Sequence, residues 1–294
     1  MNIDCYIYIS KRTKFNIMTK SFSTIFIIFF YIFIFQNATG QSIKQTSVFL
    51  EELTWVEVQE FVDNDGTTII IPTGGTEQNG PHMVLGKHNF RVKYMAEKIA
   101  LELGDAIVAP TIAFVPEGKI DPPEDWMTYP GTISLPEEYF IKLLEYTCRS
   151  LNQHGFIDIL LIGDSGGNQN GMRVVSEALN DEWKNSETRV HFISEYYGKP
   201  FDQMNDSLIA SGISPDIVGS HAGIIDVSFL MAIDSSMIRS EKLAQNDLNV
   251  ESKLEMGFSG DPSKANVTLG EQMIQKTLEA SLSQILLLKV NNRK

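Results

Sequence analysis

The folded part of this chain is poor in cysteine and in basic residues. Cys148 is the only cysteine after residue 40, so the body of the chain cannot form an internal disulfide bond. Lysine and arginine together number 24 against 37 aspartates and glutamates, which gives a net charge of −13. Such an acidic surface repels phosphate groups, so we expect neither nucleic acid nor an anionic lipid surface as a partner.

Long hydrophobic runs are also absent, with one exception near the start of the chain. Residues 22–35 read FSTIFIIFFYIFIF, follow four basic residues and precede Ala38 and Gly40. This layout is typical of a secretory signal peptide, and the run is shorter than the roughly 20 residues that a membrane-spanning helix needs. We therefore expect residues 1–40 to be a signal peptide that is cleaved before Gln41, with an uncleaved membrane anchor as the alternative.

Removal of this segment would leave an exported protein, periplasmic or secreted, with no membrane association. Residues 1–40 hold four basic residues and one acidic residue, so the net charge of the remainder would fall from −13 to −16. The remaining residues, 41–294, contain no internal repeat, no low-complexity tract and no linker-like segment after residue 45. They predict a single domain that is long enough to bury a large core.

Short runs rich in β-branched residues alternate with longer segments of helical period. We expect strands at residues 67–73, 106–112, 157–163 and 190–194, and helices at 89–103, 136–154, 171–184 and 268–287. This alternation predicts an α/β fold with a mainly parallel sheet flanked by helices on both faces. In such sheets, ligands bind beyond the carboxyl ends of the strands.

Two glycine-rich polar loops follow two of the expected strands. The first is TGGTEQNGPH at residues 73–82, and the second is GDSGGNQNG at residues 163–171. Because both loops leave carboxyl ends of strands, we expect them to form neighbouring walls of one site. Neither loop has the spacing of a dinucleotide-binding or P-loop motif, so a phosphate cradle is the weaker interpretation.

Three histidines lie in polar, glycine- or proline-rich segments rather than in helical stripes. Each of them has a structural explanation, as a turn cap, a helix start or a core hydrogen bond. Together with three carboxylates, however, they supply the nitrogen and oxygen donors that a zinc or manganese ion prefers. These residues are His82, His88 and His221, with Glu77, Asp164 and Asp226. The other two histidines, His154 and His191, are expected to be structural.

Five segments, in chain order, resemble the signatures of the creatininase family of metal-dependent amidohydrolases. The first, PTGGTEQNGPHMVLGKHN at 72–89, resembles the family pattern P-x-G-S/T-x-E-Q-H-G-P-H-L-P-L-G-T-D. Two more resemble N-G-H-G-G-N and H-A-G-E-x-E-T-S, namely GDSGGN at 163–168 and HAGIIDVS at 221–228. The remaining two are PGTISL at 130–135 and GFSGDPSKAN at 257–266.

The resemblance implies a three-layer α/β fold, a homo-oligomer that is commonly a hexamer, and one or two divalent ions at the strand ends. In this family a metal-bound water attacks a cyclic amide or a related carbonyl group, because the ion acidifies the water and polarises the carbonyl. Carried over to this chain, the resemblance implies Glu77, His88 and Asp164 as metal ligands. It also implies catalytic positions for His221 and Asp226.

This chain departs from the family pattern at several of these positions. Asn79 replaces a histidine, and His88 replaces an aspartate that bridges two ions. Ser165 and Ile224 replace a histidine and a glutamate. An amide is a poor zinc ligand and a histidine cannot bridge as a carboxylate does, so we expect one zinc or manganese ion per chain rather than two.

A long segment without regular period, FVPEGKIDPPEDWMTYPGTIS at residues 114–134, separates two of the signatures. Loops of this length are more often functional than idle. We expect it to form a wall or lid of the site, with a subunit contact as the alternative. The residues expected to contact a substrate are Glu117, Trp126 and Tyr129 from this segment, together with His82 and Asn168.

The sequence therefore predicts a metal-dependent hydrolase that acts on a C–N or related bond of a small polar cyclic substrate. The altered ligands motivate an alternative, a protein of the same fold that binds a small molecule without catalysis. A third hypothesis is a serine hydrolase that uses Ser165 and His221, although the G-x-S-x-G spacing of a nucleophile elbow is missing.

Overall fold

The computed structural model describes residues 47–244 and 248–292. The chain divides into two units, Met1–Gln45 and Thr46–Lys294, and the described residues all belong to the second. The expected signal peptide, residues 1–40, lies outside the described part. Within that part, no helix combines the length and the apolar character needed to span a bilayer.

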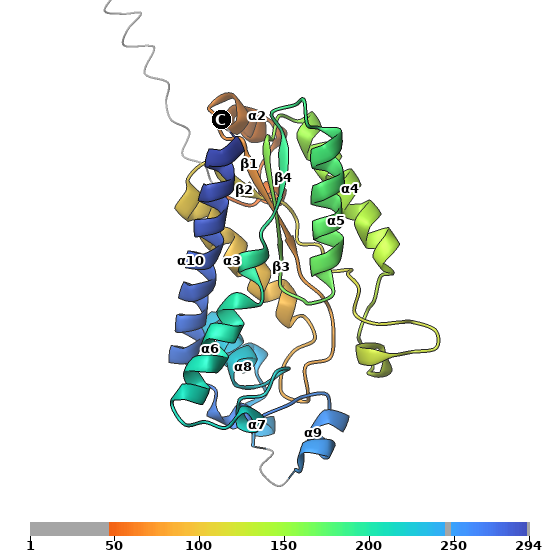
Figure 1. Ribbon diagram of the computed structural model, residues 1–294, viewed down its shortest axis with the longest axis vertical. Coiled ribbons are helices and arrows are strands. Elements are labelled where there is room, and N and C mark those ends of the chain that lie inside the picture. Colours follow the sequence, from red (N-terminus) through yellow and green to blue (C-terminus); the bar gives the residue numbers. More distant parts are fainter. Residues whose placement is uncertain (1–46, 245–247, 293–294) are drawn as a thin grey trace, which may run out of the picture. The chain divides into compact units, whose positions relative to one another are not determined.

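Strands and helices alternate along the first two thirds of this unit, and helices and turns follow (Figure 1). The strands are β1 (Thr68–Thr73), β2 (Ala106–Val108), β3 (Asp158–Gly163) and β4 (Arg189–Phe192). The helices are α2 (Trp55–Asp63), α3 (Lys87–Leu103), α4 (Glu137–Gln153), α5 (Asn168–Glu182), α6 (Lys199–Ala210), α7 (Pro215–Val218), α8 (Ile224–Asp234), α9 (Val250–Glu255) and α10 (Val267–Asn292). Short 3-10 turns are η1 (Leu50–Glu52), η2 (Asp125–Thr128), η3 (Ser194–Tyr196), η4 (Ser235–Met237), η5 (Ser240–Lys242) and η6 (Pro262–Lys264).

The four strands form one parallel sheet in the order β2-β1-β3-β4. Strand β1 pairs along its whole length with β3, from Thr68 opposite Asp158 to Thr73 opposite Gly163. Strand β2 is shorter than the predicted 106–112, because Pro110 has no N–H to donate to the ladder and only Ile112 returns to bridge Thr73. The predicted parallel α/β architecture is confirmed.

Helices cover both faces of the sheet, because successive strand residues point to opposite sides. Ile69 and Ile71 of β1 pack into a core formed with α4 and α5, whereas Ile70 packs into a second core formed with α3, α8 and α10. Figure 1 shows the same arrangement, with α4 and α5 on one side of the strands and α3 and α10 on the other. The sheet is thus the middle of three layers.

Two helices begin earlier than their apolar periodicity predicts. Helix α3 starts at Lys87 rather than at residue 89, and α5 starts at Asn168 rather than at residue 171. Gly86 and Gly167 precede these starts. Consequently, Lys87, His88 and Arg91 lie in the first turns of α3, at the edge of the sheet where β1 and β3 end.

Candidate active site

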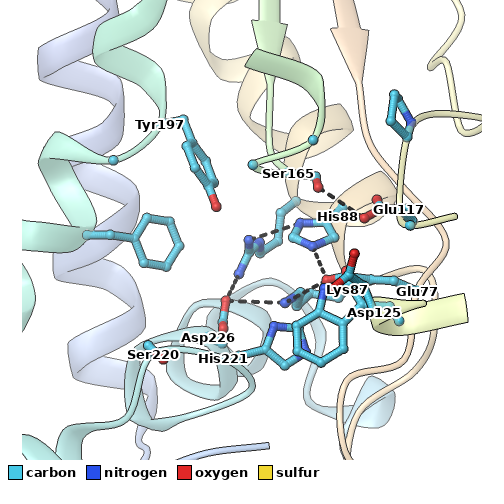
Figure 2. Close-up of a pocket in the computed structure, with 18 of the residues that line it drawn as sticks. Glu77, Lys87, His88, Glu117, Asp125, Ser165, Tyr197, Ser220, His221 and Asp226 are labelled. Carbon is cyan, nitrogen blue, oxygen red and sulfur yellow. Dashed lines mark hydrogen bonds and ion pairs between the residues drawn. The ribbon is translucent and has the colours of Figure 1, made fainter. Parts of the chain in front are cut away.

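A cavity of about 720 Å³ lies where the loops that follow β1 and β3 meet. This volume is within the range of small-molecule sites. Its walls come from the loop after β1, the start of α3, the 114–134 segment, the Gly-rich loop before α5, the segment around α6 and the start of α8. Figure 2 shows Ser165, Glu117 and His88 toward one side of the cavity and Asp226 and His221 toward the other.

A buried line of three side chains, Glu77, His88 and Asp164, forms the floor of the site. His88 Nε2 lies 2.6 Å from Oε1 of Glu77, and His88 Nδ1 lies 2.6 Å from Oδ1 of Asp164. Both ring nitrogens therefore lie within hydrogen-bond distance of carboxylate oxygens. Burial raises the pKa of Glu77, but the charge and hydrogen bond of His88 and the charge of Lys87 hold it below its ordinary value.

Arg91 is fully buried next to this line. Its Nε donates to Oδ1 of Asp164 at 2.8 Å, its Nη2 also contacts that oxygen, and its Nη1 donates to Oδ1 of Asp226 at 2.5 Å. The guanidinium group also lies over the rings of Phe201 and Phe229, 5.3 and 5.0 Å from their centroids. Burial lowers the pKa of Arg91, but the two aspartates more than compensate, so the arginine stays charged.

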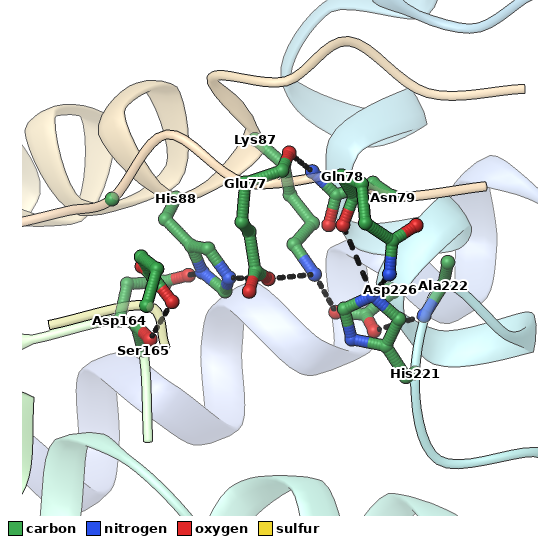
Figure 3. A network of polar contacts seen from close by, with 12 residues as sticks. Glu77, Gln78, Asn79, Lys87, His88, Asp164, Ser165, His221, Ala222 and Asp226 are labelled. Carbon is green, nitrogen blue, oxygen red and sulfur yellow. Dashed lines mark hydrogen bonds and ion pairs between the residues drawn. The ribbon is translucent and has the colours of Figure 1, made fainter. Parts of the chain in front are cut away.

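Lys87 places its ammonium group between two carboxylates. Its Nζ lies 3.6 Å from Oε1 of Glu77 and 3.5 Å from Oδ1 of Asp226, and the side chain is buried (Figure 3). Asp226 also accepts a backbone hydrogen bond from Ala222 at 2.9 Å. Burial raises the pKa of Asp226, but Lys87 and Arg91 lower it well below its ordinary value. Asp226 is therefore ionised.

Glu117 is a buried carboxyl group of the site that its surroundings hold neutral. Its backbone follows Pro116 in the 114–134 segment, and its Oε2 accepts a hydrogen bond from Ser165 Oγ at 3.3 Å. Burial and the neighbouring Glu77 carboxylate raise the pKa of Glu117 to about 9. Gly167 permits this close approach of the segment, because an added Cβ there would lie 2.0 Å from the Pro116 carbonyl oxygen.

His221 lies against Trp126, with ring centroids 4.2 Å apart and ring planes 15° apart. Its Nε2 is 3.1 Å from both the backbone oxygen and the side-chain nitrogen of Gln78. Burial and the positive charge of Lys87 lower the pKa of His221 to about 4. The imidazole is therefore neutral at physiological pH.

The structure brings most of the predicted site residues into this cluster, although not all of them. Glu77, His88, Asp226, His221, Glu117 and Trp126 line the cavity, and Asp164 lies directly behind His88. Three predicted substrate contacts are not among the described residues that line it: Tyr129, His82 and Asn168.

Each of these three side chains forms hydrogen bonds with the loops of the site, and their contact with a substrate remains a prediction. The Tyr129 hydroxyl donates to the backbone oxygens of Leu254 and Glu255, both at 3.1 Å. His82 Nε2 lies 2.9 Å from the carbonyl oxygen of Ala222. The Asn168 amide donates to backbone and hydroxyl oxygens at the end of β1. They stabilise the loops that shape the cavity.

Two charged side chains that line the cavity, Lys87 and Arg91, were missed by the sequence reasoning. The sequence did contain a signal for Lys87, since a lysine stands here at the position where the family pattern has threonine, directly before His88. Arg91 gave a weaker signal, as a charged residue that directly precedes Val92 of the apolar stripe of α3. The apolar periodicity of α3 predicts which helix face is buried, but it does not predict which side chain pairs with a buried charge on that face.

The serine-hydrolase hypothesis also predicts a specific contact. A serine nucleophile needs a base within hydrogen-bond reach. The hydroxyl of Ser165 donates to Glu117, which is neutral, and His221 instead contacts Gln78. The geometry therefore does not support Ser165 as an activated nucleophile.

The residues expected to hold a divalent ion do not fit one in this arrangement. Both nitrogens of His88 already face carboxylates, and the carboxylates of Glu77 and Asp226 face the Lys87 ammonium. Within residues 47–244 and 248–292, no three or more His, Cys, Asp or Glu side chains are placed to hold a metal ion. A divalent ion about 4 Å from the ammonium would meet a repulsion of about 8 kcal/mol at an effective dielectric constant of about 20.

Comparison with known proteins agrees with the fold. A family model described as Creatininase, creatinine amidohydrolase, matches residues 51–285. This chain belongs to the creatininase family. A creatinine amidohydrolase from Pseudomonas putida is 23% identical over 207 residues, which cover 68% of this chain and 77% of that protein. A mycofactocin precursor peptide peptidase from Mycolicibacterium smegmatis is 23% identical over 235 residues, which cover 74% and 83%.

Another relative of this chain has a name that indicates a sugar-derived substrate. A 3-dehydro-scyllo-inosose hydrolase from Thermotoga maritima is 29% identical over 124 residues. That match covers 42% of this chain and only 37% of the relative. The relatives are therefore hydrolases whose names indicate different substrates.

Solved structures show the creatininase fold directly. A crystal structure of creatinine amidohydrolase superposes with a TM-score of 0.68 at 19% identity and covers 83% of this chain and 98% of that chain. Similar creatininase structures were solved as a manganese form and as a zinc–zinc form. Those ions belong to the neighbours, and the fit of a metal to this chain depends on its own side chains.

Proposed function

We propose that this chain is a creatininase-family hydrolase that cleaves an amide-type C–N bond of a small polar cyclic substrate in the 720 Å³ cavity. One observation carries the proposal: His221 and Glu117, whose pKa values are shifted in opposite directions by their surroundings, line the same cavity. The pKa of His221 is lowered to about 4, and that of Glu117 is raised to about 9. Pairs of groups whose surroundings separate their pKa values in this way are typical of acid–base catalysis.

Each of these residues has a role that follows from its protonation state. Neutral His221 accepts the proton of a water molecule as the water attacks the carbonyl carbon, and Trp126 holds the imidazole plane by stacking. Glu117 carries the proton that the leaving nitrogen needs. Asp226 stays ionised and anchors the backbone next to His221 through Ala222, so it acts by positioning.

The substrate class is inferred from the lining of the cavity and from the relatives. Aromatic side chains line the cavity beside charged ones, and the aromatic residues are Trp126, Tyr197 and Phe201. Such a surface suits a small ring with polar substituents. The relatives act, by their names, on creatinine, an inosose and a precursor peptide, which supports a carbonyl-containing substrate. Export of the chain and a homo-oligomeric assembly remain predictions.

The single zinc or manganese ion expected from the resemblance is not part of this proposal. The carboxylates that would hold it face Lys87 and Arg91. The metal content of the full chain after incubation with zinc or manganese tests whether such an ion binds.

The test is a screen of the full chain against lactams, cyclic imides, creatinine and inosose-type ring ketones, with NMR detection of the ring-opened product. For any substrate found, His221→Asn should lower kcat by about 100-fold or more, because it removes the proton acceptor. His154→Asn is the matched control, since His154 ends α4 and does not line the cavity. Equal rates in both variants would contradict the assignment of His221.

A second candidate is a binding protein without catalysis. It is favoured by the internal pairing of Glu77, Asp164 and Asp226, since each of these three carboxylates already faces a cation of the chain. A compound from the same screen that raises the melting temperature but is not consumed over days would favour this candidate. Turnover of that compound would favour the hydrolase.

A further inference from the structure

Three buried carboxylates at the centre of the site face cations that belong to the chain itself. Glu77 and Asp226 face Lys87, Asp226 and Asp164 face Arg91, and His88 lies between Glu77 and Asp164. Buried carboxylates require such partners, because an unpaired charge in the interior is strongly unfavourable. Here the partners are covalently part of α3.

Lys87 differs from Arg91 in how it contacts its partners. Arg91 forms short hydrogen bonds to both aspartates. The Lys87 ammonium lies 3.5 and 3.6 Å from its two carboxylates, which is beyond the usual 2.7–3.2 Å of an N–H···O hydrogen bond. No hydrogen bond from Lys87 Nζ to another described residue is present, and Lys87 lines the cavity.

The ammonium group of Lys87 lies at a position where carboxylates from two segments face a single cation. It lies between carboxylates contributed by two separate segments, the loop after β1 and the start of α8, at the edge where β1 and β3 end (Figure 3). The chain also has Lys87 and His88 where the family pattern has threonine and aspartate. A substitution that adds a positive charge and removes a negative one works against a divalent cation at this position.

We propose that Lys87 replaces a divalent metal ion as the cation of this cavity and excludes such an ion from it. A ligand oxygen that enters the cavity then meets an ammonium group with unused N–H donors. The inference concerns the same site as the proposed function, but it holds whether or not the chain turns over a substrate.

The experiment measures cation binding and stability rather than activity. The full chain is incubated with zinc or manganese, separated from free ion by gel filtration and analysed for metal. The wild-type protein should hold fewer than about 0.1 ions per chain, and its melting temperature should change by less than about 1 °C with millimolar manganese. About one ion per chain, or a clear rise in melting temperature, would overturn the proposal.

The variant Lys87→Ala tests whether the lysine is responsible. It leaves Glu77 and Asp226 without their shared cation, so its melting temperature should fall and should recover with added manganese or methylammonium. Lys142→Ala is the matched control, because Lys142 lies on the exposed surface of α4 and pairs only with Glu145 among the described carboxylates. A folded Lys87→Ala protein whose stability responds to neither cation would show that Lys87 does not occupy a cation position.

An unfolded Lys87→Ala protein would be replaced by Lys87→Met, which keeps the length of the side chain and removes its charge. Metal uptake by the wild-type chain decides the question independently of either variant. Because no substrate is needed, a negative substrate screen would contradict the proposed function and leave this inference intact.

Discussion

Glutamine at position 117 should make this protein more stable, and increasingly so as the pH rises. Glu117 is 5% exposed, and burial together with the Glu77 carboxylate raises its pKa from 4.5 to about 9. The folded state therefore keeps a proton that the unfolded chain releases above pH 4.5. By linkage, the free energy of unfolding falls between pH 4.5 and 9 because the folded state binds the extra proton.

The magnitude follows from the size of the shift. Each pKa unit corresponds to about 1.4 kcal/mol, so two pH units within this window cost the wild-type protein about 3 kcal/mol through this residue. Glutamine imitates the protonated acid, because its oxygen can accept from Ser165 and its NH₂ can donate to Glu77. It has no proton to lose, so Glu117→Gln should gain about 3 kcal/mol on the wild type between pH 5.5 and 7.5.

Urea denaturation of both proteins at pH 5.5, 6.5 and 7.5 measures this difference. Glu271→Gln, on the exposed surface of α10, is the control for a change from carboxyl to amide that alters no buried group. A difference between Glu117→Gln and wild type that stays constant within about 0.5 kcal/mol across this range would refute a neutral Glu117. Glu117→Gln should nevertheless lose hydrolytic activity, since an amide cannot supply the proton.

Other predictions concern the remaining groups of the site. Arg91→Met should lower the free energy of unfolding by about 3–5 kcal/mol, because it removes the buried cation that Asp164 and Asp226 share, whereas Arg149→Met on the surface should cost less than about 1 kcal/mol by urea denaturation. Trp126→Ala should expose the His221 ring and raise its pKa from about 4 toward 6.5, which NMR titration of the ring protons detects. Gly167→Ala should lower the melting temperature, because the new methyl group would lie 2.0 Å from a backbone oxygen of the cavity wall; an unchanged melting temperature would show that this wall yields easily.

Much of the fold could be predicted because it depends on local patterns. Continuous apolar runs identified the strands, and helical stripes identified α3, α4, α5 and α10 within a few residues, whereas α2, α6 and α8 were not predicted. The helix boundaries were predicted less well where glycine-rich loops join helices. The first turn of α3 holds the polar residues Lys87 and His88, so the apolar stripe does not mark where this helix begins. Pro110 ended β2 earlier than predicted for a reason that the sequence contained.

The site was predictable in its location and less so in its contacts. Two polar loops at strand ends correctly placed Glu77 and Asp164 in one cluster. Substrate contact by Tyr129 and Asn168 stays a prediction, and their side chains donate hydrogen bonds to backbone oxygens of other loops. Residue type alone cannot distinguish a side chain that faces a cavity from one that holds its wall.

The sequence by itself determined the parallel α/β fold, the rim on which the site lies and the membership of the creatininase family, because these follow from periodicity and from ordered motifs. Only the tertiary structure decided how the charges of the site are balanced. Lys87 and Arg91 come from one helix, while their partners Glu77, Asp164 and Asp226 come from three other segments. Charge pairing depends on distances of a few ångströms between such segments, and packing of the sheet and helices sets those distances.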